Sequence, residues 1–322
     1  MPTGHETDEI LHKIFMPYAD QCIEAKIKSK QRLVHYTTAA GALGILSTKS
    51  LWLRNALVMD DFSEVQTGFA ELSKYFQDEK KRGRFSQAFD GVNSNTLRLA
   101  IERFDQWWGH VQTNTFLACF SEHAESEDAI GKLSMWRAFG KSETGVALVL
   151  RFPEKYAALP LKLMLRPVMY LDTPDRIEAE LSQVVTNVES NYPFLNTLDP
   201  DRIVNALFYM LVLTTVTTKH QGFYEEREYR LCYFPLLNKS DFITDQTVTI
   251  HGIPQVVHKV PLENNTEQGI HGMSLNELLD RVIIGPSQYS LSIAQSLSRA
   301  MERAGVDKPD SKIAISNIPI RT

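Results

Sequence analysis

Residues 33–55 read LVHYTTAAGALGILSTKSLWLRN, and this stretch decides how the rest of the chain is interpreted. The apolar run that ends in His35-Tyr36 predicts a strand over residues 32–36. Thr37 or Thr38 can cap a helix that continues to about residue 48, because a threonine hydroxyl accepts a hydrogen bond from a free amide of the first turn. Leu51-Trp52-Leu53 then predicts a second strand. The stretch therefore predicts strand, helix and strand in close succession.

Similar signals along the chain predict helices and strands that do not alternate strictly, which favours an α+β fold over a doubly wound sheet. No repeat or convincing linker occurs, so we expect a helical extension over 1–30 and a single domain over 31–322 with a helical insert at about 174–222. Helices are predicted over about 8–30, 60–80, 96–110, 133–139, 174–222 and 290–304, and strands over about 115–121, 144–152, 226–234, 248–260 (a hairpin), 282–284 and 312–315.

Composition indicates a cytoplasmic protein. The net charge of -5 argues against a protein that coats nucleic acid through its overall field. The N-terminus is polar and acidic, unlike a secretory signal, and the most apolar segment (207–216) is too short to span a bilayer, so no membrane partner is expected. The cysteines, Cys22, Cys119 and Cys232, are isolated, which is typical of reduced thiols and not of a zinc site.

Several common catalytic motifs are missing from the sequence. It contains no GxSxG nucleophile elbow, no HExxH metal motif and no Walker A motif. Gly41 and Gly44 form a GxxG inside a predicted helix, where they favour close packing over phosphate binding. No metal is expected.

Three segments carry residues that chemistry could use, and each has a structural alternative. His35-Tyr36 can be a functional pair at a strand end or an ordinary strand end. In the predicted strand 226–234, alternation places Glu226, Glu228 and Arg230 on one face, either as active-site carboxylates or as a solvated strand end that Arg230 neutralises.

The third segment joins Ser121, at the end of a predicted strand, to a short helix that carries Trp136 and Phe139. These aromatics are three residues apart and share a helix face, which is typical of a core as well as of a ligand platform. The acidic turn at 60–64 is equally open, because it can cap the following helix.

Together these segments resemble a widespread bacterial family of unknown function, DUF family 2971, which has been related to the ADP-ribosyltransferase fold. Departures from the family pattern are Asp60 in place of Asn, Phe62 in place of Pro and Phe223 in place of Trp. The resemblance covers about 30–290 in order, and the matching motifs are His35-Tyr36-Thr37, Gly44-Ile45-Leu46, Leu51-Trp52-Leu53-Arg54-Asn55, Asp60-Asp61-Phe62-Ser63-Glu64, Ala118-Cys119-Phe120-Ser121, Met135-Trp136, Gly145-Val146-Ala147-Leu148, Lys219 with Phe223, Glu226, Glu228 and Arg230, and Ile283-Ile284-Gly285-Pro286.

The resemblance implies an ADP-ribosyltransferase-like core, a mixed or antiparallel split sheet with added helices, and NAD as a substrate. ADP-ribosyl transfer passes through an oxocarbenium-like transition state, which a carboxylate near the ribose stabilises. On this resemblance Glu228 is the charge stabiliser and Glu226 positions or deprotonates the acceptor. The residues implied in binding NAD are His35, Tyr36, Ser121, Trp136, Arg230 and Arg54.

Three functions remain open at this point. The first is an NAD-dependent ADP-ribosyltransferase that modifies a macromolecular acceptor, as a toxin or anti-phage defence effector would. The second is an NAD glycohydrolase, in which water is the acceptor. The third is a protein of the same fold that binds a nucleotide or a partner without catalysis. Convergence of His35, Ser121 and the Glu226/Glu228 pair is the feature that separates the first two from the third.

Overall fold

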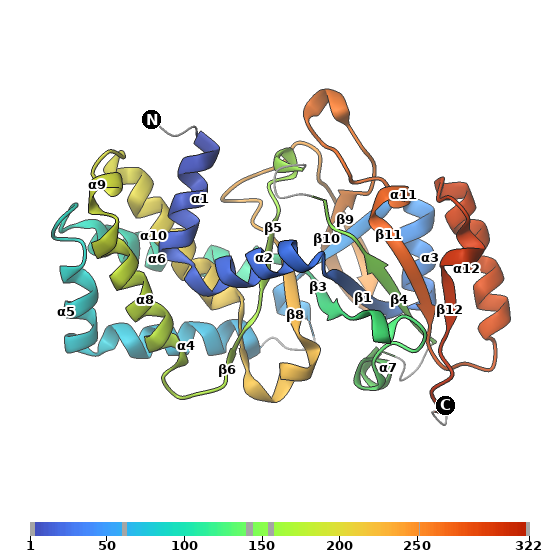
Figure 1. The fold of residues 1–322 in the computed structure, drawn as a ribbon. Helices are drawn as coiled ribbons and strands as arrows, with labels where there is room; N and C mark the ends of the chain where they lie inside the picture. Colours follow the sequence, from blue (N-terminus) through green and yellow to red (C-terminus); the bar gives the residue numbers. More distant parts are fainter. Residues whose placement is uncertain (1–3, 60–62, 140–143, 154–157, 251, 320–322) are drawn as a thin grey trace. The chain divides into compact units, whose positions relative to one another are not determined.

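A computed structural model describes residues 4–59, 63–139, 144–153, 158–250 and 252–319, and its fold is α+β, as predicted (Figure 1). The chain divides into two compact units, each assembled from three separate segments. A helical unit contains residues 1–28, 56–114 and 166–224, and a sheet unit contains residues 29–55, 115–165 and 225–322. No helix among the described residues is both long enough and apolar enough to cross a bilayer.

In the helical unit, α10 (Pro200–Val216) is the central helix, because most of its side chains are buried. It packs against α4 (Ser63–Gln77) and α6 (Thr96–Thr113). Gly68 permits the close approach of α4, since a Cβ at this position would lie 2.3 Å from the Thr215 carbonyl oxygen. The remaining elements are α1 (Gly4–Phe15), most of α2 (Pro17–Ser29), η1 (Ala56–Val58), α5 (Glu79–Gln87), β6 (Met169–Leu171), α8 (Arg176–Ser190), α9 (Tyr192–Leu195), β7 (Thr218–His220) and most of η4 (Gln221–Glu226).

The sheet unit is built on β3 (Phe116–His123), with which three strands pair. β8 (Glu228–Tyr233) pairs antiparallel with Phe116–Ser121 along one edge of β3. Two strands share the other edge: β1 (Arg32–Thr38) pairs with residues 121–123, and β2 (Ser50–Asn55) pairs with residues 116–117. The sheet is therefore split at β3.

Beyond this split the sheet continues in both directions in the order β12-β11-β4-β1-β3-β2-β10-β9. All these neighbours run antiparallel except β11 and β12, which are parallel. β8 also pairs with β5, whose first residues belong to this unit. The outer strands are β4 (Gly145–Leu150), β5 (Met164–Pro167), β9 (Thr244–Ile250), β10 (Ile253–Pro261), β11 (Leu279–Ile284) and β12 (Ile313–Ile315).

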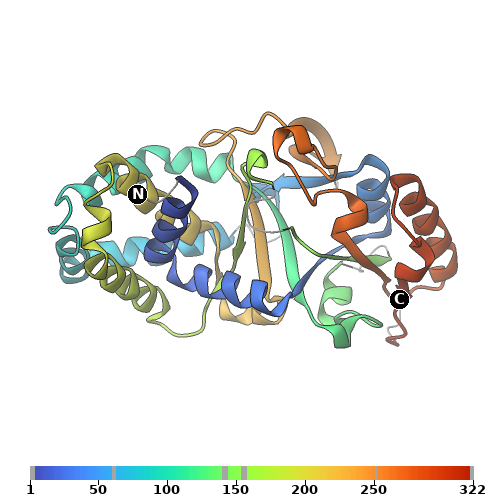
Figure 2. The ribbon, with the colours of Figure 1, turned by 45° about the horizontal axis from the view of Figure 1, so that its top comes forward.

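The two faces of the sheet bury different sets of side chains. One face, which we call face A, carries Leu33, Phe120 and Leu148 and is covered by α3 (Ala39–Thr48) and α12 (Ser290–Ala304). These two helices lie side by side at the right of Figures 1 and 2. The opposite face, face B, carries Val34 and is covered near β4 by α7 (Leu133–Phe139). The sheet unit also contains η2 (Glu125–Glu127), η3 (Leu159–Leu161), η5 (Thr266–Gln268), α11 (Leu275–Leu278) and η6 (Pro309–Lys312).

Local signals predicted most of these elements correctly. Thr38 caps α3 by accepting a hydrogen bond from the Gly41 amide (3.1 Å). Close packing is confirmed at Gly41, where a Cβ would lie 2.3 Å from Thr37 Oγ1, but Gly44 faces open space. The helix predicted over 8–30 is divided in two at Pro17, which lacks an amide hydrogen. Three residues of the predicted acidic turn, Asp60, Asp61 and Phe62, lie outside the described residues.

Candidate functional site

Strand alternation places most of the predicted site residues on face B. Ser121 on β3 lies directly opposite Glu228 on β8, and both are buried. Arg230 is opposite Cys119, two residues further along both strands and therefore on the same face. Ser121 also pairs with Val34 of β1 on its other side. The structure thus brings Ser121, Glu228 and Arg230 together in two successive rows of one sheet face.

Glu228 and Arg230 form a bidentate ion pair within β8. The Arg230 Nε–H donates to Glu228 Oε1 at 2.9 Å, and its second guanidinium nitrogen donates to Oε2 at 3.2 Å. Both side chains are almost fully buried, with 4% of Glu228 and 3% of Arg230 exposed. Two parallel charge-assisted hydrogen bonds fix the carboxylate plane and compensate its burial.

Arg54 lies on the same face at the opposite side of β3. It pairs with Leu117, which in turn pairs with Cys232 of β8. The Arg54 Nε–H donates to Gln255 Oε1 at 3.0 Å, so its guanidinium is held at the β2–β10 side of the face. Arg54 and Arg230 lie on strands that flank β3 on opposite sides, and neighbouring strands are about 4.8 Å apart. Along the strand direction they are offset by two residues.

Glu226 does not share this strand. The structure begins β8 at Glu228 and places Glu226 at the end of the 3-10 helix η4. Between them Arg227 has a left-handed backbone (φ 42°), and its carbonyl accepts the Glu122 amide at 3.0 Å. A left-handed residue interrupts the period-two alternation, and the predicted strand face that joined Glu226 to Glu228 is therefore wrong.

His35 lies in the middle of β1 and not at its end, because pairing with β4 continues to Thr38. Alternation assigns it to face A, with Leu33 and opposite to Val34, and its ring lies 5.4 Å from that of Phe120. Its Nδ1–H donates to the Cys119 carbonyl at 2.8 Å, across the split between the two strands that share β3. Burial lowers the pKa of His35. The ring is therefore neutral at pH 7, with Nε2 as a hydrogen-bond acceptor.

Tyr36 of β1 packs against Trp136 of α7 on face B. Their rings are 5.0 Å apart in an edge-to-face arrangement, and both are only 3% exposed. The Tyr36 hydroxyl accepts the Lys132 amide at 2.9 Å, and the Trp136 indole donates to the Ile130 carbonyl at 2.7 Å. Burial raises the pKa of Tyr36. These contacts account for both aromatics as members of the core.

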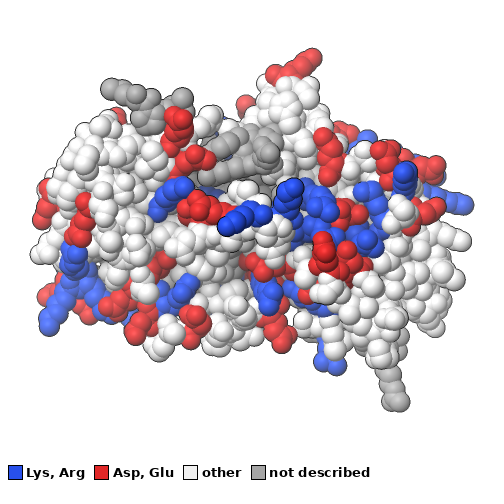
Figure 3. Space-filling view, viewed as in Figure 1, with Lys and Arg blue, Asp and Glu red and all other residues white. Residues whose placement is uncertain are grey.

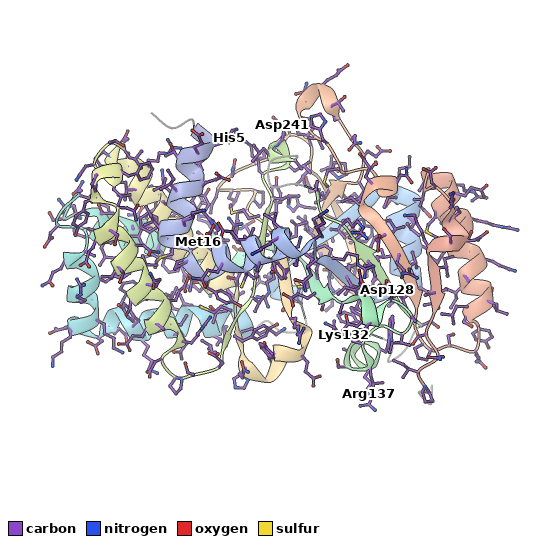
Figure 4. All side chains as sticks on the ribbon, viewed as in Figure 1. His5, Met16, Asp128, Lys132, Arg137 and Asp241 are labelled. Atoms are coloured by element: carbon purple, nitrogen blue, oxygen red, sulfur yellow. The ribbon has the colours of Figure 1, made fainter. Side chains whose placement is uncertain are left out.

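Sequence reasoning missed a group of charged and polar side chains in contact, which we call the Arg32 cluster: Arg32, His123, Asp128 and Asp280. The Arg32 guanidinium contacts Asp128 at 2.8 Å and Asp280 at 2.6 Å. His123 Nε2 lies 2.8 Å from Asp128 Oδ1, so it donates to that carboxylate. Asp128 belongs to the segment between β3 and α7 (Figure 4), and Figure 3 shows basic and acidic atoms interleaved on this part of the surface. The sequence feature that could have indicated this cluster is Arg32, a charged residue at the first position of a buried strand.

Contacts within the Arg32 cluster shift the pKa values of its own side chains. Burial by itself raises the pKa of Asp128, but hydrogen bonds from Arg32 and His123 outweigh it and leave this pKa below its usual value. Asp280 behaves in the same way, with Arg32 and Arg151 as the cations that lower its pKa. Burial lowers the pKa of His123. Among the described residues no group of three or more His, Cys, Asp or Glu side chains is arranged to hold a metal ion.

Comparison with known proteins supports the resemblance over part of the chain. Residues 135–231 match the model of a family described as "Protein of unknown function (DUF2971)". The matched segment begins at α7 and ends within β8, so it includes Trp136, Glu226, Glu228 and Arg230. Comparisons with the curated proteins and with the solved structures found no match. This region of the chain is therefore similar to a domain whose function is unknown.

Proposed function

We propose that the protein is an NAD-dependent ADP-ribosyltransferase that modifies a macromolecular acceptor. The observation that carries the proposal is the direct pairing of Ser121 with Glu228 on face B. A hydroxyl and a carboxylate on paired strands can both contact one ribose, since the strands are about 4.8 Å apart. The carboxylate then stabilises the positive charge that develops as the bond to nicotinamide breaks.

Arginines on the same face supply the groups that a dinucleotide needs beyond its ribose. A diphosphate is best bound by guanidinium groups, because their planar donors match phosphate oxygens. Arg230 has the additional role of orienting the Glu228 carboxylate. Arg54, fixed by Gln255, is the second candidate for the diphosphate. His35 takes no part in this site, because it lies on face A beside Phe120 and its Nδ1–H is committed to the Cys119 carbonyl.

A binding protein without turnover is the second candidate, and two observations favour it. His35 and Glu226 do not lie on face B with Ser121 and Glu228, and Glu228 is already paired with Arg230. A carboxylate that is 4% exposed and held by two hydrogen bonds already serves to stabilise the strand. In that case the pair is structural and face B binds a nucleotide or a partner without chemistry. NAD hydrolysis remains the third outcome, in which water replaces the acceptor.

The test is incubation of the protein with a cell lysate and NAD that carries a ³²P label in its adenylyl phosphate. Label in protein or nucleic acid supports the transferase, and free labelled ADP-ribose supports the glycohydrolase. If neither product forms, the binding protein is the correct alternative. Equilibrium binding of NAD to the purified chain then separates a nucleotide-binding protein from one that binds only a partner.

Glu228→Gln tests the assigned charge stabiliser, since it removes the charge and keeps the shape. Activity should fall at least about a hundredfold, as for loss of one transition-state contact of this kind. Glu225→Gln is the matched control, because Glu225 is exposed and three residues away in the chain. Glu226→Gln decides which carboxylate of the pair is essential. Thermal unfolding of each variant must accompany the assay, because Glu228→Gln leaves Arg230 without its bidentate partner.

A further inference from the structure

A groove of about 460 Å³ lies between α3 and α12 in the sheet unit. Its floor is apolar and includes Leu46, Ala300 and Ala304. Leu43 stands at its edge with 41% of its surface exposed. A volume of this size is in the range of pockets that hold small organic molecules.

The polar part of the groove is basic. Arg299 and Arg303 project from successive turns of α12, and Lys49 follows the end of α3. Both arginines are exposed, and neither makes an ion pair with any residue that the structure describes. Lys49 contacts Glu263 at 3.2 Å, but these side chains are 37% and 61% exposed, so the pair is weak. The groove therefore has an excess of positive charge.

This local excess contrasts with the net charge of the chain, which is -5. Two other exposed arginines on its helices have acidic partners: Arg98 contacts Glu102 one turn away at 2.7 Å, and Arg84 contacts Glu189 at 2.6 Å. Two arginines at positions i and i+4 repel each other and reduce the stability of a helix. The cost is recovered when an anion lies between them.

We propose that the α3–α12 groove binds a small organic phosphate. The Cβ atoms of Arg299 and Arg303 are about 6 Å apart, as for any i,i+4 pair, so both guanidinium groups can reach one tetrahedral anion. A phosphate dianion matches three cations better than a singly charged carboxylate does, and its oxygens accept several donors at once. The Ser47 hydroxyl adds a further donor, whereas that of Ser296 already donates to the Ser292 carbonyl at 2.9 Å. The apolar floor accommodates the organic part of the ligand.

This site is separate from the one on face B. α3 and α12 pack on face A, with the core that contains Phe120 and Leu148. Ser121 and Glu228 alternate to the opposite face of the same sheet. Binding in the groove thus neither requires nor follows from the proposed NAD chemistry, and it can be tested whatever the outcome of that proposal.

Calorimetric titration of the full chain at low salt with three probes tests the inference: phenyl phosphate, inorganic phosphate and benzoate. Phenyl phosphate should bind most tightly, because it satisfies both the cations and the apolar floor, and its affinity should fall as salt is added. Arg299→Gln/Arg303→Gln should weaken phenyl phosphate at least tenfold. Leu43→Ser should reduce the preference for phenyl phosphate over inorganic phosphate and leave the inorganic ion almost unaffected.

The matched control is Arg137→Gln, which removes an exposed arginine of α7 and should leave the affinity unchanged. Thermal unfolding identifies any variant that does not fold. The proposal is overturned if phenyl phosphate shows no saturable binding to the native chain, or if Arg137→Gln weakens it as much as the double variant does. Tighter binding of benzoate than of phenyl phosphate would also overturn it, since a carboxylate would then be the preferred anion.

Discussion

Replacement of Arg32 by methionine should destabilise the sheet unit by about 3 kcal/mol, because it removes the cation that joins two carboxylates. The Arg32 side chain is only 8% exposed and contacts Asp128 at 2.8 Å and Asp280 at 2.6 Å. Removal of one partner of a buried ion pair costs about 3–5 kcal/mol. The lower figure applies here, because the two carboxylates are 24% and 20% exposed. Asp280 also retains Arg151 at 2.8 Å.

Hydrogen exchange measured by mass spectrometry provides the assay, because it reports on β1, β3 and β11 separately from the helical unit. A loss of about 3 kcal/mol corresponds to an increase of about 10² in exchange rate for amides that exchange by opening of the sheet. Arg151→Met is the matched control, since Arg151 contacts the same Asp280 carboxylate but is 54% exposed. That exposed pair should contribute no more than about 1 kcal/mol.

The reasoning is refuted if Arg32→Met and Arg151→Met accelerate exchange equally, or if neither changes it. A second variant tests the physical cause. In Arg32→Met/Asp280→Asn, one of the two carboxylates that lost Arg32 is also removed, so part of the protection should return. If the double variant is as unstable as the sum of the single ones, packing of the arginine and not its charge is what β1 requires.

Two further predictions concern the stability of the same unit. The free energy of unfolding should decrease as the pH falls from about 7.5 to about 5.5, because the histidines with a lowered pKa take up protons near pH 6.5 in the unfolded chain and not in the folded one. The decrease is up to about 1.4 kcal/mol per pH unit for each of these histidines. The histidines are His35, His123 and His258. A urea midpoint that stays constant or rises as the pH falls would contradict the prediction. Gly285→Ala should destabilise by about 1–3 kcal/mol, since its Cβ would lie 2.9 Å from both the Gly145 carbonyl oxygen and the Trp136 ring. Gly44→Ala in α3, where a Cβ meets nothing within 4 Å, should instead stabilise slightly, and equal thermal shifts in the two variants would exclude this explanation.

Sequence analysis predicted elements whose ends have local signals. The helices over 133–139 and 290–304 occur with those bounds, and the latter ends at Gly305, whose left-handed backbone (φ 86°) stops a helix. Thr38 capped α3 as expected. The extent of β1 was underestimated, because pairing with β4, and not local propensity, carries it to Thr38.

What could not be predicted depends on contacts distant in sequence or on an unexpected backbone conformation. Arg32 lies 248 residues from Asp280, and no periodic pattern connects them. Arg227 is not a residue type that favours a left-handed conformation, so alternation was continued through it and Glu226 was assigned to the wrong element. The pairing of Ser121 with Glu228 required the register of β3 and β8, which neither segment shows alone.

Successive residues of β3 point to opposite faces of the sheet, and this places the two candidate sites on opposite sides of one strand. Phe120 contributes to the core beneath α3 and α12, and Ser121 pairs with Glu228. A ligand in the α3–α12 groove and one on face B cannot touch, so any coupling between them must pass through the backbone of the strands. The His35 Nδ1–H donates to the Cys119 carbonyl, so a side chain on face A is hydrogen-bonded to the strand that carries Ser121. If the two sites influence each other, His35 is therefore the residue at which such coupling should first be measured.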